Sequence, residues 1–167
     1  MLRSCVAAAK VDGAVSVFLE PIALYHTRDL HEPGDELWLG PYAGPSDWEL
    51  FHVPIGRGRT YGDGRDLTIV TFANGLHMSR RVAHTLSRQG VGVRVLDLRW
   101  LAPLPVADIV REANATGRVL VVDETRRSGG VSERAIVASV SGRKGWRPRN
   151  PRSSCSPAGR CAVPVTR

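Results

Sequence analysis

Acidic residues end two short apolar runs of this chain, and a loop with chemistry-bearing side chains follows each. Asp97 closes the run V-R-V-L-D, and Asp123 closes the run V-L-V-V-D. The second loop continues through Glu124 to Arg126-Arg127-Ser128-Gly129-Gly130. Neighbouring guanidinium groups can bind a carboxylate or a partner protein. The alternative is a solvated loop whose glycines permit a close turn.

The segment Asn74-Gly75-Leu76-His77 follows a predicted strand and opens a predicted helix. Open α/β sheets bind ligands at the carboxyl ends of their strands, so this loop could line a site. The interpretation that we favour is a tight turn in which Asn74 caps the helix. The glycines at 56, 58, 62 and 64 superficially resemble a phosphate-binding loop. They precede a strand instead of opening a helix, and therefore indicate a turn.

Metal-ligand and nucleophile signatures are missing from the sequence. The histidines are His26, His31, His52, His77 and His84. None forms an H-x-x-x-H pair or neighbours a cysteine, which favours solvated or half-buried side chains over metal ligands. There is no G-x-S-x-G motif for a serine nucleophile.

Three apolar runs flanked by glycines predict strands at residues 67–72, 91–97 and 119–122. Continuous apolar runs are typical of strands buried on both faces, as in a parallel sheet covered by helices. Helical periodicity at 76–89 and 105–116 separates these strands, and a further helix is expected at 131–140. The order predicts a three-layer α/β/α fold with a mainly parallel sheet and right-handed crossovers.

The periodicity also assigns a buried face to each helix. In 76–89 the expected buried stripe is Met78, Val82 and Leu86, and the solvated side carries Arg80, Arg81 and Arg88. In 105–116 the expected buried stripe is Val106, Ile109, Val110 and Ala113. Asp108 is placed near the positive end of that helix dipole.

The N-terminal third shows weaker patterns. Residues 1–12 are interpreted as the C-terminal half of a helix, and Val15 to Leu19 as a short strand. Residues 37–64 carry frequent proline and glycine, with a short strand expected near Phe51 to Ile55. The chain contains no apolar run long enough for a membrane span.

The charge of the chain is concentrated at its C-terminal end. Residues 1–140 hold 16 basic and 16 acidic residues, whereas residues 141–167 hold 7 basic residues and no acid, which accounts for the net charge of +7. A neutral domain with a basic tail does not suggest a nucleic-acid-binding domain, so nucleic acid is an unlikely partner. The tail composition predicts disorder.

The segments D-L-R-W-L-A-P-L-P and V-L-V-V-D-E-T-R-R-S-G-G-V-S-E resemble the C-terminal domain of the transketolase superfamily. The branch that they resemble most is the β subunit of thiamine-diphosphate-dependent 2-oxo acid dehydrogenases of the pyruvate or branched-chain type. The matching positions are Asp97, Leu98, Arg99, Leu101, Pro103, Leu104, Asp123, Glu124, Gly129, Gly130 and Glu133. An upstream segment resembles the family's F-x-E-P-x-x-L-Y, at Phe18, Glu20, Pro21, Leu24 and Tyr25.

The resemblance implies an oxidoreductase in which thiamine diphosphate and Mg²⁺ bind between two other domains. No residue of this chain corresponds to the family's catalytic, cofactor-binding or metal-binding residues, so the cofactor is not expected to bind this chain alone. Expected partners are α-type and β-type subunits and the acyltransferase core, in the cytoplasm and without membrane contact. The residues expected at the rim of the cofactor cleft or at an interface are Glu20, Tyr25, Asn74, His77, Arg99, Glu124, Arg126 and Arg127.

Both ends depart from the family pattern. We expect residues 1–140 to form the family domain, truncated at both ends and lacking its edge element, and residues 141–167 to be a basic disordered tail derived from a frameshift. The first functional interpretation is the C-terminal part of such a β subunit, inactive alone. The alternatives are a noncatalytic subunit-pairing module and, less favoured, a basic nucleic-acid-binding protein.

Overall fold

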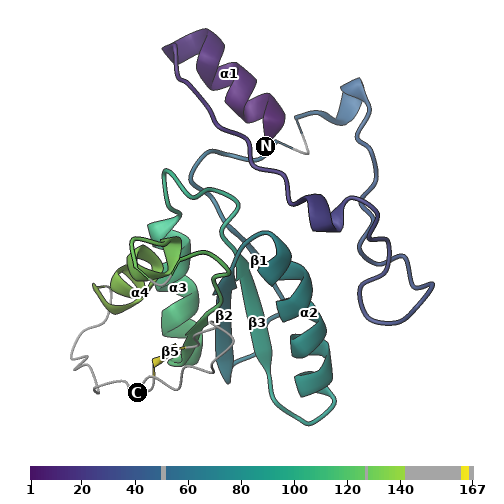
Figure 1. Cartoon of the computed structure of the whole chain (residues 1–167), viewed down its shortest axis with the longest axis vertical. Coiled ribbons are helices and arrows are strands. Elements are labelled where there is room, and N and C mark those ends of the chain that lie inside the picture. The colour runs from purple at the N-terminus through teal and green to yellow at the C-terminus, as the bar shows by residue number, and fades with distance from the viewer. Residues whose placement is uncertain (50–51, 127, 142–162, 166–167) are drawn as a thin grey trace.

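The apolar runs predicted as strands form the centre of a single sheet. The structure, a computed structural model, describes residues 1–49, 52–126, 128–141 and 163–165 (Figure 1). The sheet contains β1 (Arg59–Tyr61), β2 (Leu67–Thr71), β3 (Val93–Asp97), β4 (Val119–Val121) and β5 (Val163–Val165), in the order β1-β3-β2-β4-β5. β2 pairs in parallel with β3 and β4, whereas β1 and β5 are antiparallel to their neighbours. The α/β fold is confirmed, but the sheet is mixed, because only the three central strands are parallel and both edge strands run antiparallel to them.

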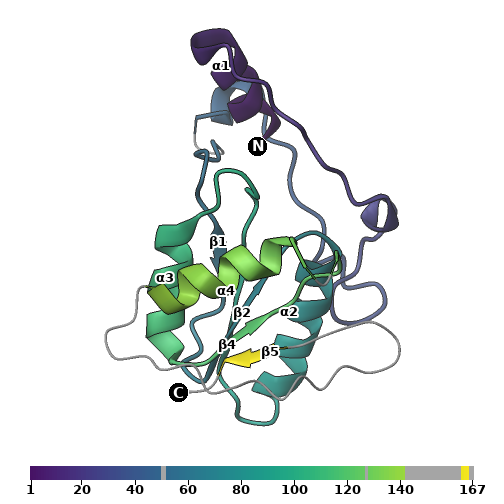
Figure 2. The same ribbon diagram turned by 60° about the vertical axis from the view of Figure 1, so that its left-hand side comes forward.

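Helices cover both faces of this sheet, which gives the three predicted layers. α2 (Asn74–Ser87) lies on one face, and α3 (Val106–Thr116) and α4 (Val131–Ser141) lie on the other (Figures 1 and 2). Successive strand residues alternate between two cores, as the pleat of a strand requires. Ile69 and Val95 belong to the α2 cluster, whereas Val70 and Leu96 belong to the α3/α4 cluster.

The buried face of α2 differs from the predicted one. Met78 and Val82 are about half exposed, at 48% and 49%. Leu76 and Ser79 are buried, and Leu86 packs on the core as expected. The helix rotation is set by Gly75, where an added Cβ would lie 2.2 Å from Thr71 Oγ1. Because apolar residues occur on two adjacent faces of this helix, periodicity alone could not choose between them.

The buried face of α3 includes two carboxylates that the sequence pattern placed elsewhere. Ile109 and Ala113 are fully buried as predicted, but Val106 is 48% exposed. Asp108 and Glu112 are buried instead, at 1% and 4% exposure. Buried carboxylates require ionic or hydrogen-bonding partners.

Arginines from β3, from the segment before β1 and from α3 itself supply those partners. Arg94 of β3 donates to Glu112 Oε2 at 2.7 Å and to the carbonyl oxygens of Gly64 and Asp63 at 2.7 and 2.9 Å. Arg111 pairs with both Asp108 and Glu112. Arg57 lies 3.3 Å from Asp108, and the Gly58 N–H donates to the same carboxylate at 2.9 Å. This set of contacts, which we call the α3 ion cluster, joins residues 57–64 to β3 and α3.

The α3 ion cluster explains why a strand forms at β1. The glycines of residues 56–64 form close approaches and turns, as predicted, and not a phosphate loop. A Cβ added at Gly64 would lie 2.1 Å from the carbonyl carbon of Gly92, and one added at Gly58 would lie 2.9 Å from Leu96 Cδ1. The strand expected near Phe51 to Ile55 is wrong for the described residues 52–55, because the chain reaches the β3 edge only at Arg59–Tyr61.

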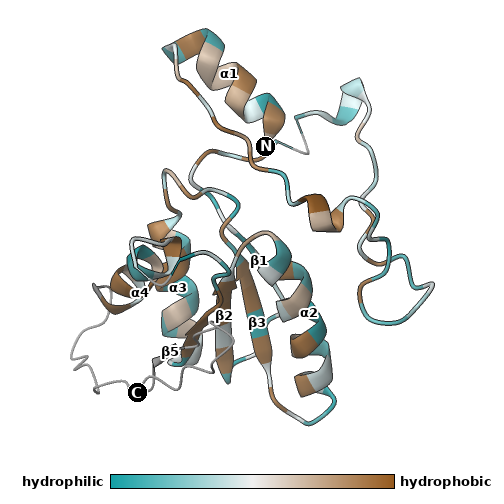
Figure 3. Cartoon of the chain, in the orientation of Figure 1, coloured by the Kyte–Doolittle hydropathy of each residue, from teal (hydrophilic) through white to brown (hydrophobic). Residues whose placement is uncertain are grey.

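The N-terminal region lies outside the sheet. α1 (Leu2–Asp12) confirms the expected helix and is followed by an extended segment, residues 13–25, which we call the N-terminal arm. The strand expected at Val15 to Leu19 is wrong, because no strand lies beside this segment to pair with it. Figure 3 shows apolar residues along the arm. The arm includes the short helix η1 (Ile22–Leu24), and a second one, η2 (Pro45–Asp47), follows later. Within the described residues, no helix is both long and apolar enough to cross a membrane.

The prediction of a missing edge element is corrected by β5. Val163–Val165 pairs antiparallel with β4, with Val119 opposite Val165. These three residues therefore cover the β4 edge, and the disorder predicted for 141–167 is wrong for them. Residues 142–162 and 166–167 of the predicted tail lie outside the described residues. Ser141 ends α4.

Gly64→Ala should destabilise the domain, because its Cβ would collide with the backbone of Gly92. Neither backbone can move without disturbing the contact of Arg94 with Gly64, so we expect a loss of about 1–3 kcal/mol in the free energy of unfolding. Chemical denaturation measures this loss. Gly40→Ala is the matched control, since a Cβ there meets nothing within 4 Å. Equal stability of the two variants would contradict the close approach.

Asp108→Asn should lower the free energy of unfolding at neutral pH by about 2–3 kcal/mol. The variant lacks the buried carboxylate that pairs with Arg111 and Arg57 in the α3 ion cluster. Burial raises the pKa of Asp108, but Arg111 and Gly58 outweigh it, and the pKa lies below its ordinary value. The stabilisation is therefore present above the ordinary pKa, near about 4, and is lost as the pH falls through the lowered value. The difference between variant and wild type should shrink in acid, as measured by thermal unfolding across pH. The exposed Asp12→Asn serves as control, and a difference that grows in acid would contradict the argument.

Candidate functional site

The carboxyl ends of β2 and β4 form the position where this fold class places ligands. The two strands are neighbours, and their connections leave toward opposite faces, to α2 after β2 and to α4 after β4. Such a switch point opens a crevice at the strand ends. Asn74 enters it from the β2 side and Glu124 from the β4 side. Asn74 Nδ2 donates to Glu124 Oε2 at 3.3 Å, so two predicted site residues meet there.

Backbone geometry holds Asn74 in this position. Ala73 has φ 51° and ψ −127°, a conformation that non-glycine residues rarely adopt. The prediction that Asn74 caps α2 is wrong, because Ala73 occupies the cap position and no side-chain cap bond forms there. The Asn74 side chain turns across the crevice, and its Oδ1 is buried without a hydrogen-bond partner among the described residues. The loop therefore lines the switch point, as the alternative interpretation proposed.

Asp123 organises the loop between β4 and α4. Its carboxylate accepts hydrogen bonds from the Thr125 N–H at 2.8 Å and the Ser132 N–H at 2.9 Å, which caps the start of α4. Burial raises the pKa of this carboxyl, yet these hydrogen bonds outweigh burial and hold the pKa below its ordinary value. Gly130 fits against them, since an added Cβ would lie 2.9 Å from the Arg126 carbonyl oxygen. The close-turn interpretation of this glycine pair is confirmed at Gly130.

Of the two arginines in this loop, Arg126 is exposed, and Arg127 lies outside the described residues. Their predicted role at an interface stays a prediction.

Asp97 and Arg99 form a turn after β3. Arg99 has φ 56°, its N–H donates to Asp97 Oδ1 at 3.2 Å, and its Nε lies 3.8 Å from Asp97 Oδ2. Burial raises the pKa of Asp97, and the pKa stays above its ordinary value although Arg99 opposes that shift. The pair shapes the turn, and no contact joins it to Asn74 or Glu124 within the described part of the chain.

Glu20 and Tyr25 lie on the N-terminal arm, away from the switch point (Figure 1). The Tyr25 hydroxyl donates to Glu20 Oε2 at 2.6 Å, and this hydrogen bond raises the pKa of Tyr25. Both side chains are exposed. The structure therefore does not bring these two predicted residues to the crevice.

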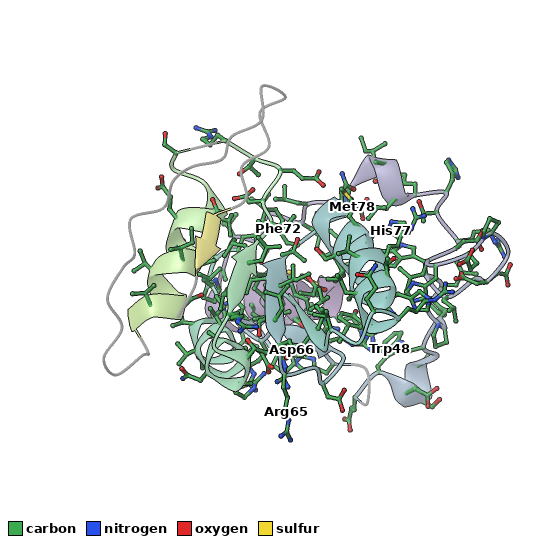
Figure 4. The ribbon with its side chains drawn as sticks, turned by 90° about the horizontal axis from the view of Figure 1, so that it is seen from below. Trp48, Arg65, Asp66, Phe72, His77 and Met78 are labelled. Atoms are coloured by element: carbon green, nitrogen blue, oxygen red, sulfur yellow. The ribbon has the colours of Figure 1, made fainter. Side chains whose placement is uncertain are left out.

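His77 is held by a loop that the sequence patterns did not identify as a site. The loop, residues 28–38, lies against α2, and we call it the strap. His77 Nε2 lies 3.0 Å from the Asp29 carbonyl oxygen, and the ring stands edge-on to Trp38 with centroids 4.9 Å apart. Figure 4 labels His77 and Met78 on α2. It also shows Arg65, which comes shortly before β2, pointing away from the domain. The residues Pro33-Gly34-Asp35, which are typical of a turn, are the local sequence signal of this loop.

The strap also reverses the assignment of Arg80 to solvent. The Arg80 guanidinium carbon lies 4.5 Å from the Tyr61 ring centroid and 6.0 Å from that of Trp38. Cation–π contacts of this kind attract a guanidinium to aromatic faces. Arg81 and Arg88 are exposed, as predicted.

The described residues do not fit thiamine diphosphate with its Mg²⁺. A metal-diphosphate site needs converging carboxylate or other oxygen ligands. No three His, Cys, Asp or Glu side chains gather as a metal site in the described ranges. At the switch point the carboxylate of Glu124 is engaged with Asn74. We therefore assign no cofactor or metal ligand among the residues that the structure describes.

Comparison with known proteins agrees with the fold. The family "Transketolase, C-terminal domain" matches residues 56–150. The β subunit of the pyruvate dehydrogenase E1 component of Bacillus subtilis is 28% identical over 79% of this chain and 36% of its own length. The corresponding Staphylococcus aureus subunit is 32% identical over 76% of this chain and 34% of its own length.

Two further relatives extend the comparison. The β subunit of acetoin:2,6-dichlorophenolindophenol oxidoreductase of Cupriavidus necator is 30% identical over 63% of this chain and 28% of its own length. A solved split-gene transketolase, described as an inactive β4 tetramer, is similar with a TM-score of 0.50 and 28% identity, covering 55% of this chain and 30% of that one. The chain thus spans about a third of the length of the curated relatives that it matches. This chain belongs to the transketolase C-terminal domain family.

Proposed function

We propose that this chain provides the C-terminal domain of the β subunit of a thiamine-diphosphate-dependent 2-oxo acid dehydrogenase and is catalytically inactive by itself. The intact enzyme would decarboxylate pyruvate or a branched-chain 2-oxo acid oxidatively in the cytoplasm. Thiamine diphosphate would serve there as electron sink, bound by other domains. The division into a domain at 1–140 and a tail at 141–167 stays a prediction.

Two observations together carry this proposal. The family match extends across the sheet, and the carboxylates of the domain are engaged in contacts that hold its elements together. The buried carboxylates of Asp108 and Glu112 are used in the α3 ion cluster, and the partly buried carboxylate of Asp123 is used at the start of α4. A general acid or base must reach a substrate proton. The role that these contacts support is therefore that of a scaffold at the cofactor cleft's rim. Asn74 and Glu124, at the switch point, are the rim residues that we favour.

The noncatalytic pairing module remains a second candidate, and the N-terminal arm favours it. Val15, Val17, Leu19 and Ile22 are between 70% and 95% exposed. Contiguous exposed apolar residues mark interaction surfaces. A relative in the solved structures is an inactive tetramer of β chains. We propose that the arm contacts a β-type chain and that α-type subunits and an acyltransferase core bind elsewhere on the assembled enzyme.

The inactivity proposal predicts that the purified chain neither binds thiamine diphosphate nor turns over pyruvate. We expect no binding heat on calorimetric titration with thiamine diphosphate and Mg²⁺. We also expect no pyruvate-dependent reduction of 2,6-dichlorophenolindophenol above the blank. A complete α and β pair from a relative such as the Bacillus subtilis enzyme is the positive control. Saturable binding by this chain alone would contradict the proposal.

The pairing proposal predicts self-association through the arm. The purified chain should show a mass that rises with concentration in light scattering. Val17→Ser combined with Leu19→Ser should shift the measured mass toward that of the monomer. The reason is that each Å² of apolar surface buried between copies stabilises the association by about 25 cal/mol, and the variant loses part of this surface. Val137→Ser, on α4 and 63% exposed, is the matched control. A wild-type chain that is monomeric throughout would rule out pairing between copies.

A further inference from the structure

The strap is built to keep its own shape independently of the sheet. Asp35 accepts backbone hydrogen bonds at 2.7–3.0 Å from Leu30, His31, Glu32 and Leu37. Asp29 accepts two more, from Gly34 and Glu36. Although burial acts against it, these backbone donors hold the pKa of Asp35 far below its usual range. The carboxylate stays charged throughout the neutral and mildly acid range, so the strap remains folded there.

The strap docks on α2 through a set of rings, and it also carries one fully buried apolar side chain. Leu30 is 1% exposed. His31 stacks on His84 of α2 with ring centroids 4.2 Å apart and planes at 21°. Trp38 stands against His77 and lies beneath Arg80. Face-to-face imidazoles can pack this way without mutual repulsion when at least one ring is neutral.

The charged groups around His31 oppose a proton on its ring. His84 and Arg80 face it from α2, and Asp35 and Glu32 face it from the strap. Its Nδ1 is buried without a hydrogen-bond partner among the described residues. Burial and then His84 lower the pKa of His31, and the two carboxylates do not compensate. His77 differs in its contacts, because its Nε2 has a partner in the Asp29 carbonyl oxygen.

We propose that the strap is a pH-dependent latch, docked on α2 through the His31–His84 stack while the His31 ring is uncharged and released as a unit when His31 takes up a proton. Release bares Leu30, Trp38 and the covered side of α2. Because docking disfavours the protonated ring, the docked state binds fewer protons than the released one. Docking therefore strengthens as the pH rises. It is complete above the ordinary histidine pKa, about 6.5, and weakens below it.

Fluorine NMR of the full chain labelled with 5-fluorotryptophan tests the latch. The Trp38 resonance is assigned by Trp38→Phe and followed from about pH 8 to about pH 5, the range in which histidine titrates. We expect it to move toward a solvent-exposed shift. The docking equilibrium should change about tenfold for each unit by which docking lowers the pKa. The resonance of Trp100, 8% exposed and outside the strap, should stay constant.

Matched variants separate the latch from other causes. His31→Gln should abolish the Trp38 transition, because the amide stays neutral. His84→Gln should make it shallower, because His31 then meets less repulsion. His26→Gln, exposed between the N-terminal arm and the strap, should leave it unchanged. Three outcomes would each overturn the proposal. The first is a Trp38 resonance that stays constant with pH, and the second is a transition in His31→Gln equal to that of wild type, which would assign the transition to His77. The third is a Trp100 resonance that moves together with that of Trp38, which would indicate unfolding.

Discussion

The pairing of Arg94 with Glu112 is the interaction on which the rest of the domain depends. Glu112 points from α3 into the protein at 4% exposure, and such a carboxylate is costly without a partner. Arg94 reaches it from β3 and binds the carbonyl groups of residues 63 and 64 with its remaining donors. One guanidinium thus fixes a helix, a central strand and the turn before β2. The addition of β1 to the β3 edge follows, because residues 57–64 are already held there.

The carboxylates inside the domain and the polar residues at the switch point have different roles. Charges that many enzymes use for proton transfer are here used to hold elements together, as with Asp108 and Asp123. The switch point keeps a strained Ala73 and an Asn74–Glu124 contact, and no group of His, Cys, Asp or Glu that could hold a metal gathers among the described residues. A supporting domain that shapes a cleft or a subunit interface is consistent with this distribution.

Sequence patterns were informative where one physical signal dominated. The strands at 67–71, 93–97 and 119–121 were predicted because burial on both faces demands continuous apolar runs. The helix faces failed where two signals competed: Met78 and Val82 are apolar, but Gly75 packing on Thr71 sets the rotation. Val15 to Leu19 has strand composition but no pairing neighbour. The Asn74–Glu124 contact spans 50 residues, and no local pattern encodes such a separation.

The strap and the α3 ion cluster show two ways of accommodating carboxylates, with different consequences. In the cluster, Asp108 and Glu112 are paired with arginines from distant segments, so their contribution belongs to the whole domain. In the strap, Asp29 and Asp35 bind backbone N–H groups of the same loop, so their contribution is local.

The strap also precedes residues 56–150, which the family match covers. A loop that folds by itself and docks through rings can detach without disturbing the sheet, whereas β1 cannot. Any regulation of this domain is therefore expected at the strap and not in the sheet.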